Sequence, residues 1–496
     1  MSGSSRTGQE TFGGRPYLIL PFVIGFVAVL FGVYWDDGWH TVRGRDSFWI
    51  APHLVLYAGT TLAALTIVAW GAAVIRTHGV PGLRARPSLV LGALGAAATL
   101  GSAPIDDLWH RAFGRDAVGW SPPHMLGAAG LGVLAAAVTL EVSRDRSRRG
   151  VVFATLAGAA LMAAATGPVF EYETDVPQFD EAWYLPVLAL GCAWSMGLLR
   201  SVASARYAVT AAAAVYTAFR AIDGAVLDAI GFPVPLLPLL VAPGFVIDVT
   251  AAARWGPAAR AAALVAALYA AYVPYLNWVR DDLRIDAADV AIGVAPALAA
   301  AYATFRLIDG PDQPRRPART PAVAAVVLAA VALALIASPA ALAHDPGQGP
   351  EVGRADVVGR VVAGRARLDV TPVERRLCRE LSARAVVARR AGVERRADLR
   401  RRGCTFVGRI ELPDRGRWFV YGQFADRSGE RVETWLPLRA PDQPEPKREE
   451  RSVYRASVSE AGALQVVSGV AMYLAIAVLL ASAIVLYRRQ RTAAAS

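Results

Sequence analysis

The chain is poor in the residues and motifs that usually carry electrons. It has 3 cysteines and 6 histidines among 496 residues, and no flavin, haem or iron–sulfur motif. Any redox chemistry would therefore need electrons from partner subunits or an external reductant. Lysine is also scarce, since Lys447 is the only one and nearly all positive charge is arginine. Together with abundant alanine, this indicates composition bias and says little about function.

Apolar runs dominate the sequence. It is 55% hydrophobic and has a mean hydropathy of +0.36. A run of about 20 apolar residues is long enough to cross a bilayer as a helix, so the sequence predicts a polytopic membrane protein in contact with lipid. The net charge of +11 does not indicate nucleic acid, because the arginines cluster in short loops between apolar runs, as the positive-inside rule describes.

The order of these stretches predicts an all-α membrane bundle of about 12 spans with one extracytoplasmic antiparallel β-sandwich-like domain. The expected regions are a cytoplasmic tail (1–15), a duplicated helix-hairpin metal-site domain (16–149), further transmembrane hairpins (150–310), a signal-like transmembrane helix (320–343), the β domain (344–450) and a C-terminal transmembrane helix (463–487). Arginine placement puts residues 344–450 outside the plasma membrane and both termini in the cytoplasm, unless the chain is cleaved after Ala343.

One motif occurs twice between residues 36 and 124. Both copies read Asp-Asp-x-Trp-His-x-x-x-Gly-Arg-Asp and are followed by Pro-His. The copies begin at Asp36 and Asp106, an offset of 70 residues, and end at His53 and His124. Four of the six histidines lie in these two copies, which favours a role in metal binding.

The spacing of Asp36, His40 and His53 is that of a transition-metal site. A carboxylate and an imidazole four residues apart lie on one face of a helix. A second imidazole at the start of the next helix closes on them in a hairpin, and we expect the donors to converge within about 5 Å. Two imidazoles and one carboxylate leave coordination positions open, unlike a structural zinc cage. The second copy offers the same set: Asp106, His110 and His124.

A single copy would be explained equally well as interface decoration, because aromatic and charged residues gather where a membrane meets water. Two copies in register favour the metal site. The residues around the ligands are then candidates for a second shell or for interface anchors. They are Trp39, Arg45, Asp46, Trp109, Arg115 and Asp116.

The motif resembles the C subunit of the copper membrane monooxygenases, the particulate methane and ammonia monooxygenase family. That subunit has an Asp, a His four residues later after a Trp, and a second His thirteen residues after the first; Asp36, His40 and His53 match these spacings. Asp46 matches an acidic position between the histidines, and the second copy has one residue inserted before His124. The resemblance implies copper, whereas the ligand types alone also suit iron or zinc.

A weaker resemblance links residues 320–490 to the B subunit of the same family, which is cleaved before a histidine and then folds as a β domain. The apolar run here ends in Ala341-Leu342-Ala343, a signal-peptidase pattern, just before His344. The resemblance makes His344 a further candidate copper ligand. It is the only histidine of its domain, so an ordinary residue after a span is the alternative.

Three local predictions concern the rest of the chain. Alternating patterns predict strands at 405–412, 416–424 and 431–438, followed by a polar linker at 441–451. Arg220 and Asp223 are expected to pair inside an apolar segment, with a place on a substrate path as the alternative. Cys378 and Cys404 are expected to form a disulfide, because their domain faces an oxidising compartment, with two buried free thiols as the alternative.

The leading functional hypothesis is a copper-binding membrane protein that oxidises small apolar substrates. A copper-handling or transport protein without oxygenase activity is the first alternative, and an assembly protein whose motifs only shape helix ends is the second. Other membrane subunits or a homo-oligomer are expected as partners of the oxygenase.

Overall fold

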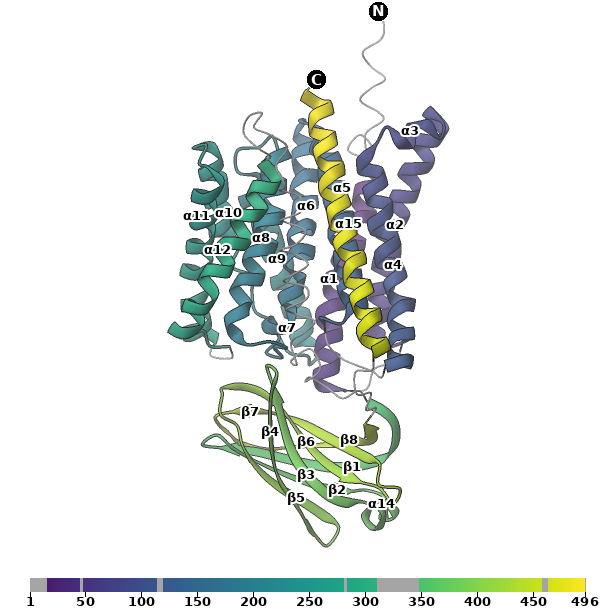
Figure 1. Ribbon diagram of the computed structural model, residues 1–496, viewed down its shortest axis with the longest axis vertical. Coiled ribbons are helices and arrows are strands. Elements are labelled where there is room, and N and C mark those ends of the chain that lie inside the picture. Colours follow the sequence, from purple (N-terminus) through teal and green to yellow (C-terminus); the bar gives the residue numbers. More distant parts are fainter. Residues whose placement is uncertain are drawn as a thin grey trace, which may run out of the picture.

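The computed structural model describes residues 16–44, 48–113, 119–280, 283–309, 348–456 and 463–495. It contains a helical bundle and, at one end of it, a β barrel (Figure 1). The C-terminal end of α15 lies at the opposite end of the bundle (Figure 1). Several predictions fall outside the described residues: the tail 1–15, the helix 320–343, the cleavage after Ala343, and the roles of Arg45, Asp46, Arg115, Asp116 and His344.

Within the described ranges, nine helices are long and apolar enough to cross a membrane, as expected of a multi-pass membrane protein. They are α1 (Pro16–Val42), α2 (Ala51–His78), α4 (Pro87–Phe113), α5 (Pro122–Val142), α6 (Arg148–Thr166), α8 (Tyr184–Val202), α11 (Pro257–Pro274), α12 (Ala287–Asp309) and α15 (Ala463–Ala495). Short helical pieces join them: α3 (Pro81–Arg84), η3 (Gly167–Val169), α7 (Phe170–Glu173), η4 (Glu181–Trp183) and η5 (Tyr275–Arg280).

The predicted count of about 12 spans is not confirmed. The hairpin expected at 206–253 contains α9 (Ala208–Ala229), which carries three charged residues, and α10 (Val241–Ala252), which has only 12 residues. Residues 232–240 between them have no regular secondary structure. The apolar run that begins at Pro321 lies outside the described residues.

Polar side chains form hydrogen bonds with the backbone of the irregular segment 232–240. The amides of Leu237 and Leu239 donate to the hydroxyls of Tyr275 and Tyr272 at 3.2 and 3.0 Å. The Arg220 guanidinium donates to the carbonyl of Leu236 at 3.0 Å. Non-helical backbone at membrane depth needs partners of this kind, because lipid offers none.

The expected pairing of Arg220 with Asp223 is wrong. Arg220 Nη1 lies 2.8 Å from Glu173 Oε2, whereas no ion pair joins Arg220 to Asp223, both of which the structure describes. The reason is that the 167–183 loop brings a carboxylate to the other side of α9, and a contact between distant segments leaves no trace in the spacing along one helix.

The duplication extends well beyond the motif. Helices α1 and α2 cross so closely at Gly25 and Gly59 that a Cβ on Gly25 would lie 2.6 Å from the Gly59 carbonyl. Gly95 of α4 and Gly130 of α5 cross in the same way, and a Cβ on Gly95 would lie 2.6 Å from the Gly130 carbonyl. Gly25 and Gly95 are 70 residues apart, as the motifs are, so α1–α2 and α4–α5 are two copies of one tightly packed hairpin.

Eight antiparallel strands form the β domain, in the order β1-β2-β5-β4-β3-β6-β7-β8. Their bounds are β1 (Gln348–Val362), β2 (Arg365–Pro372), β3 (Ser382–Arg390), β4 (Val393–Arg402), β5 (Thr405–Glu411), β6 (Gly416–Ala425), β7 (Arg431–Ala440) and β8 (Gln443–Ala456), with α14 (Arg375–Glu380) after β2. The three predicted strands correspond to β5, β6 and β7.

The sandwich-like arrangement is wrong, because β1 pairs with β8 and closes the sheet into a barrel. Residues 443–451 of the expected linker 441–451 belong to β8. Its charged side chains hide the strand pattern, because they occupy both faces of the strand: Arg448 and Glu450 are exposed, whereas Arg451 is buried. The predicted disulfide between Cys378 and Cys404 is present and ties α14 to the turn between β4 and β5.

The barrel contacts the bundle through arginines of β3, β6 and β7. Arg390 lies 3.0 Å from Asp175 and 2.8 Å from Glu181. Arg417 donates to the carbonyl of Thr174 at 2.8 Å, and Arg439 lies 3.3 Å from Asp175. The acidic loop between α6 and α8 is therefore the docking surface for the barrel.

Candidate metal centre

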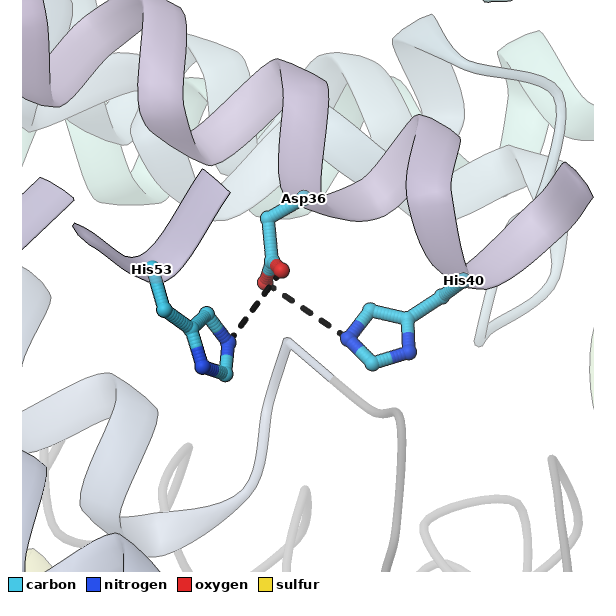
Figure 2. A group of neighbouring side chains, drawn as sticks. All are labelled: Asp36, His40 and His53. Atoms are coloured by element: carbon cyan, nitrogen blue, oxygen red, sulfur yellow. Dashed lines mark ion pairs between the residues drawn. The ribbon is translucent and has the colours of Figure 1, made fainter. Parts of the chain in front are cut away.

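The first triad comes from the end of α1 and the start of α2. Asp36 and His40 are one turn apart near the end of α1, so their side chains share one face. Pro52 lies in the first turn of α2, where proline fixes the start of a helix, and it places His53 in that same turn. Figure 2 shows the Asp36 carboxylate between the two imidazoles, at 3.6 Å from His40 Nε2 and 3.2 Å from His53 Nε2.

The second triad repeats this geometry in α4 and α5. Asp106 Oδ1 lies 3.6 Å from His110 Nε2 and 3.2 Å from His124 Nε2. In each triad the three donor atoms lie within 4.8 Å of one another, so the expected convergence is present in both. The triads differ most at the last histidine, because the side chain of His124 is 37% exposed and that of His53 is 12%.

The donor separations fit one ion in each triad. Two ligands bound at about 2.1 Å lie about 3.0 to 3.5 Å apart when the angle between them is near octahedral or tetrahedral. Asp36 Oδ1 and Asp106 Oδ1 are buried, and each lies 3.2 Å from an imidazole Nε2. Carboxylate and imidazole donors that converge in this way suit a cation at their centre.

Both triads border a single cavity of about 400 Å³. Asp36, His40 and His53 line it from one hairpin, and Asp106 and His124 line it from the other. Most of the remaining wall is apolar and reaches from the motif level toward the middle of the bundle. It includes Phe26, Leu30, Leu56, Leu100 and Leu131.

The second aspartate of each motif differs between the copies. Asp37 is 7% exposed and lines the cavity. Asp107 instead lies 2.5 Å from Arg111 on the outer side of α4. The two sites are therefore alike in their ligands and unlike in their immediate surroundings.

The two tryptophans pack helices and do not line the cavity. Trp39 stacks on Phe232, with ring centroids 6.0 Å apart, and Trp109 packs edge-on against Phe113 at 4.7 Å. Both roles expected of these tryptophans, in a second shell or as interface anchors, stay predictions.

The 167–183 loop covers the second motif, a role that the sequence did not reveal. Glu171 accepts a hydrogen bond from the Gly119 amide at 2.7 Å, and Trp120 donates to the Pro168 carbonyl at 3.0 Å. Glu173 of the same loop also reaches α1, because it accepts a hydrogen bond from Tyr34. The acidic character of the loop was visible in the sequence, but its partners lie far away in the chain.

No protein-family model, curated protein or solved structure matches this chain. Its function must be inferred from the site itself.

Proposed function

We propose that this chain is a membrane-embedded metalloprotein with two copper sites that share one apolar cavity, in which a small apolar substrate is oxidised. The observation that carries the proposal is the pair of Asp-His-His triads bordering one cavity. The residue types suit copper, iron or zinc, and the spacing resemblance to the C subunit of the copper membrane monooxygenases favours copper.

Some residues of the site would bind metal, and others line the cavity. Asp36, His40 and His53 would hold one copper ion, and the second triad would hold another. A bound copper ion with an open position supplies a site at which oxygen can react. The apolar wall would admit a small apolar molecule from the bilayer, position it beside the triads and keep water away.

The orientation in the plasma membrane is part of the proposal. The arginine-rich loops at 144–149 and 200–206 join helices at the end of the bundle away from the barrel (Figure 1). The positive-inside rule then puts the barrel and both triads outside. Because the chain has no electron-carrying motif, the oxygenase would work with other membrane subunits, with further copies of itself or with an external reductant.

Copper analysis of purified protein tests the metal sites. We expect about two copper ions per wild-type chain, one in His40→Ala and none in the double variant His40→Ala, His110→Ala, because each triad loses an imidazole. His78→Ala is the matched control, since His78 is an exposed histidine at the far end of α2. Equal copper in the wild type and the double variant would remove the basis of the proposal.

Oxygen uptake then separates an oxygenase from a copper-handling protein. The copper-loaded protein is reconstituted with a quinol and short alkanes, and uptake is compared with that of His40→Ala. Uptake that depends on His40 supports the oxygenase. Full copper occupancy without such uptake would favour copper handling instead.

A further inference from the structure

Three arginines lie side by side on the outer face of the barrel, far from the triads. Arg360 of β1 is opposite Arg367 of β2, and Arg367 is opposite Arg409 of β5. The neighbouring Ala366, Leu368 and Ile410 point into the barrel core, so the arginines point outward. Like charges directly opposite one another destabilise a sheet, and an anionic ligand would relieve this repulsion.

Only one arginine of the ladder is neutralised by the barrel. Arg367 pairs with Asp369 at 3.0 Å, whereas Arg360 and Arg409 have no acidic partner among the residues that the structure describes. The whole β domain carries an excess of positive charge. Residues 348–456 contain 25 basic and 16 acidic residues and so carry most of the net charge of the chain.

Next to the ladder, the barrel wall is open. β4 and β5 pair only from Leu399–Arg402 to Thr405–Gly408. Residues 393–398 of β4 pair with β3 alone, and residues 409–411 of β5 pair with β2 alone. The edges of β4 and β5 therefore face each other here without backbone pairing between them. Unpaired strand edges of this kind accept an added strand.

Docking to the bundle explains this gap. The tip of the β3–β4 hairpin is held by Arg390, which lies beside Asp175 and Glu181, and by the Ala391 amide, which donates to the Pro177 carbonyl at 3.1 Å. Figure 1 shows β4 rising toward the bundle while β5 lies on the far side of the barrel. The hairpin tip thus diverges from β5.

The gap forms a groove of about 830 Å³ with an apolar floor and a basic rim. Its floor contains Ala366, Ala397 and Ile410. Glu411 is the only acid that lines it, and it lies 3.4 Å from Arg365. Six arginines line the groove: Arg360, Arg365, Arg367, Arg395, Arg396 and Arg409.

We propose that this groove binds an extended segment of a partner protein in which acidic and apolar residues alternate. The segment adds as a strand between β4 and β5. Side chains of a strand alternate between its two faces, so the apolar ones enter the gap above Ala366 and Ile410 while the carboxylates meet the arginine ladder. Hydrogen bonds from the main chain of the segment to the unpaired strand edges give affinity, and the alternation of its acidic and apolar side chains gives specificity. This proposal does not depend on the metal sites.

The test uses the full-length protein in nanodiscs of neutral lipid and a fluorescent octapeptide of four Glu-Val repeats. We expect saturable binding that weakens steeply with added salt. A Lys-Val peptide should not bind. A block peptide with four Glu followed by four Val, and a Glu-Val peptide with an N-methylated backbone, should each bind at least about tenfold more weakly, because they cannot form the added strand.

Variants then locate the site. Arg395→Glu and Arg409→Glu should each weaken binding of the octapeptide about tenfold or more. Arg402→Glu, an exposed arginine in the paired part of β4, should leave it unchanged. Equal binding of the block or N-methylated peptide would overturn strand addition. An absence of peptide binding, with binding to phosphatidylglycerol vesicles that Arg409→Glu abolishes, would show a lipid-binding surface instead.

Discussion

Arg220 illustrates how single residues hold this bundle together. Its side chain has no exposed surface, and that of Glu173 is 2% exposed. The guanidinium donates to Tyr34 on α1 and to Glu173 on the 167–183 loop, and it also donates to the Leu236 carbonyl in the irregular segment after α9. Tyr34 is two residues before Asp36, so this buried ion pair fixes the end of the helix that carries the first triad. Charges at this depth are expensive unless they are paired.

We predict that Arg220→Met lowers the free energy of unfolding by about 3–5 kcal/mol, because it leaves the Glu173 carboxylate buried without its partner. Adding Glu173→Gln should recover much of this loss, since the uncompensated charge is then removed. Unfolding in mixed micelles measures both effects. The exposed Arg306→Met serves as the control. Wild-type stability of the single variant would show that the pair does not hold the bundle.

At the scale of elements, the two hairpins depend on glycine at their crossing points. The atoms nearest to a Cβ on Gly25 are the Gly59 carbonyl and the Ala63 amide, and those nearest to a Cβ on Gly95 are the Gly130 carbonyl and the Leu134 amide. All four belong to the backbone, so they cannot move away as a flexible side chain would. Each crossing sets the spacing of the two helices whose ends carry one triad.

We predict that Gly25→Ala and Gly95→Ala each cost about 1–3 kcal/mol of stability through overpacking. Each should also weaken copper binding at its own triad and spare the other, because the hairpins are separate units. Copper titration and thermal unfolding measure the two effects. Gly101→Ala on α4 is the matched control, since a Cβ there meets nothing within 4 Å. Equal losses of stability and copper binding in all three variants would contradict the role of the glycine crossings in holding the triads.

At the scale of the whole molecule, one arginine joins the barrel to the bundle at two acids. The side chain of Arg390 is 2% exposed, and Asp175 and Glu181 both lie beside it. The acidic loop that accepts Arg390 also covers the second motif and holds Arg220. Barrel docking and the order of the metal-site end are therefore linked through residues 167–183.

We predict that Arg390→Ala loosens the docked hairpin of β3 and β4. Hydrogen exchange at the Ala391 amide should become about tenfold faster or more, because its acceptor Pro177 lies across the interface. Amides at the β1–β2 turn should exchange as in the wild type. Arg384→Ala on the same strand, whose guanidinium donates within the barrel to Gly429, is the control. Unchanged exchange at Ala391 would mean that other contacts suffice for docking.

The sequence by itself determined the features that depend on neighbours along the chain. The offset of four residues from Asp36 to His40 places both on one helix face, and Pro-His at a helix start brings His53 to meet them, so both sets of donors could be predicted to converge. Period-two alternation located β5, β6 and β7. The disulfide could be predicted from the compartment expected for its domain and from the two cysteines available there. Copper as the bound metal and the oxidation of a small apolar substrate stay predictions.

Only the tertiary structure decided the features that depend on distant segments. Closure of the barrel requires β1 to meet β8 across about a hundred residues, and a strand's own alternation is the same in a sandwich and in a barrel. Arg220 forms an ion pair with Glu173 rather than with Asp223, because the 167–183 loop brings the Glu173 carboxylate to α9. The shared cavity likewise exists because two hairpins pack with their triads facing one space. Spacing encodes which residues share a face, whereas packing decides what that face meets.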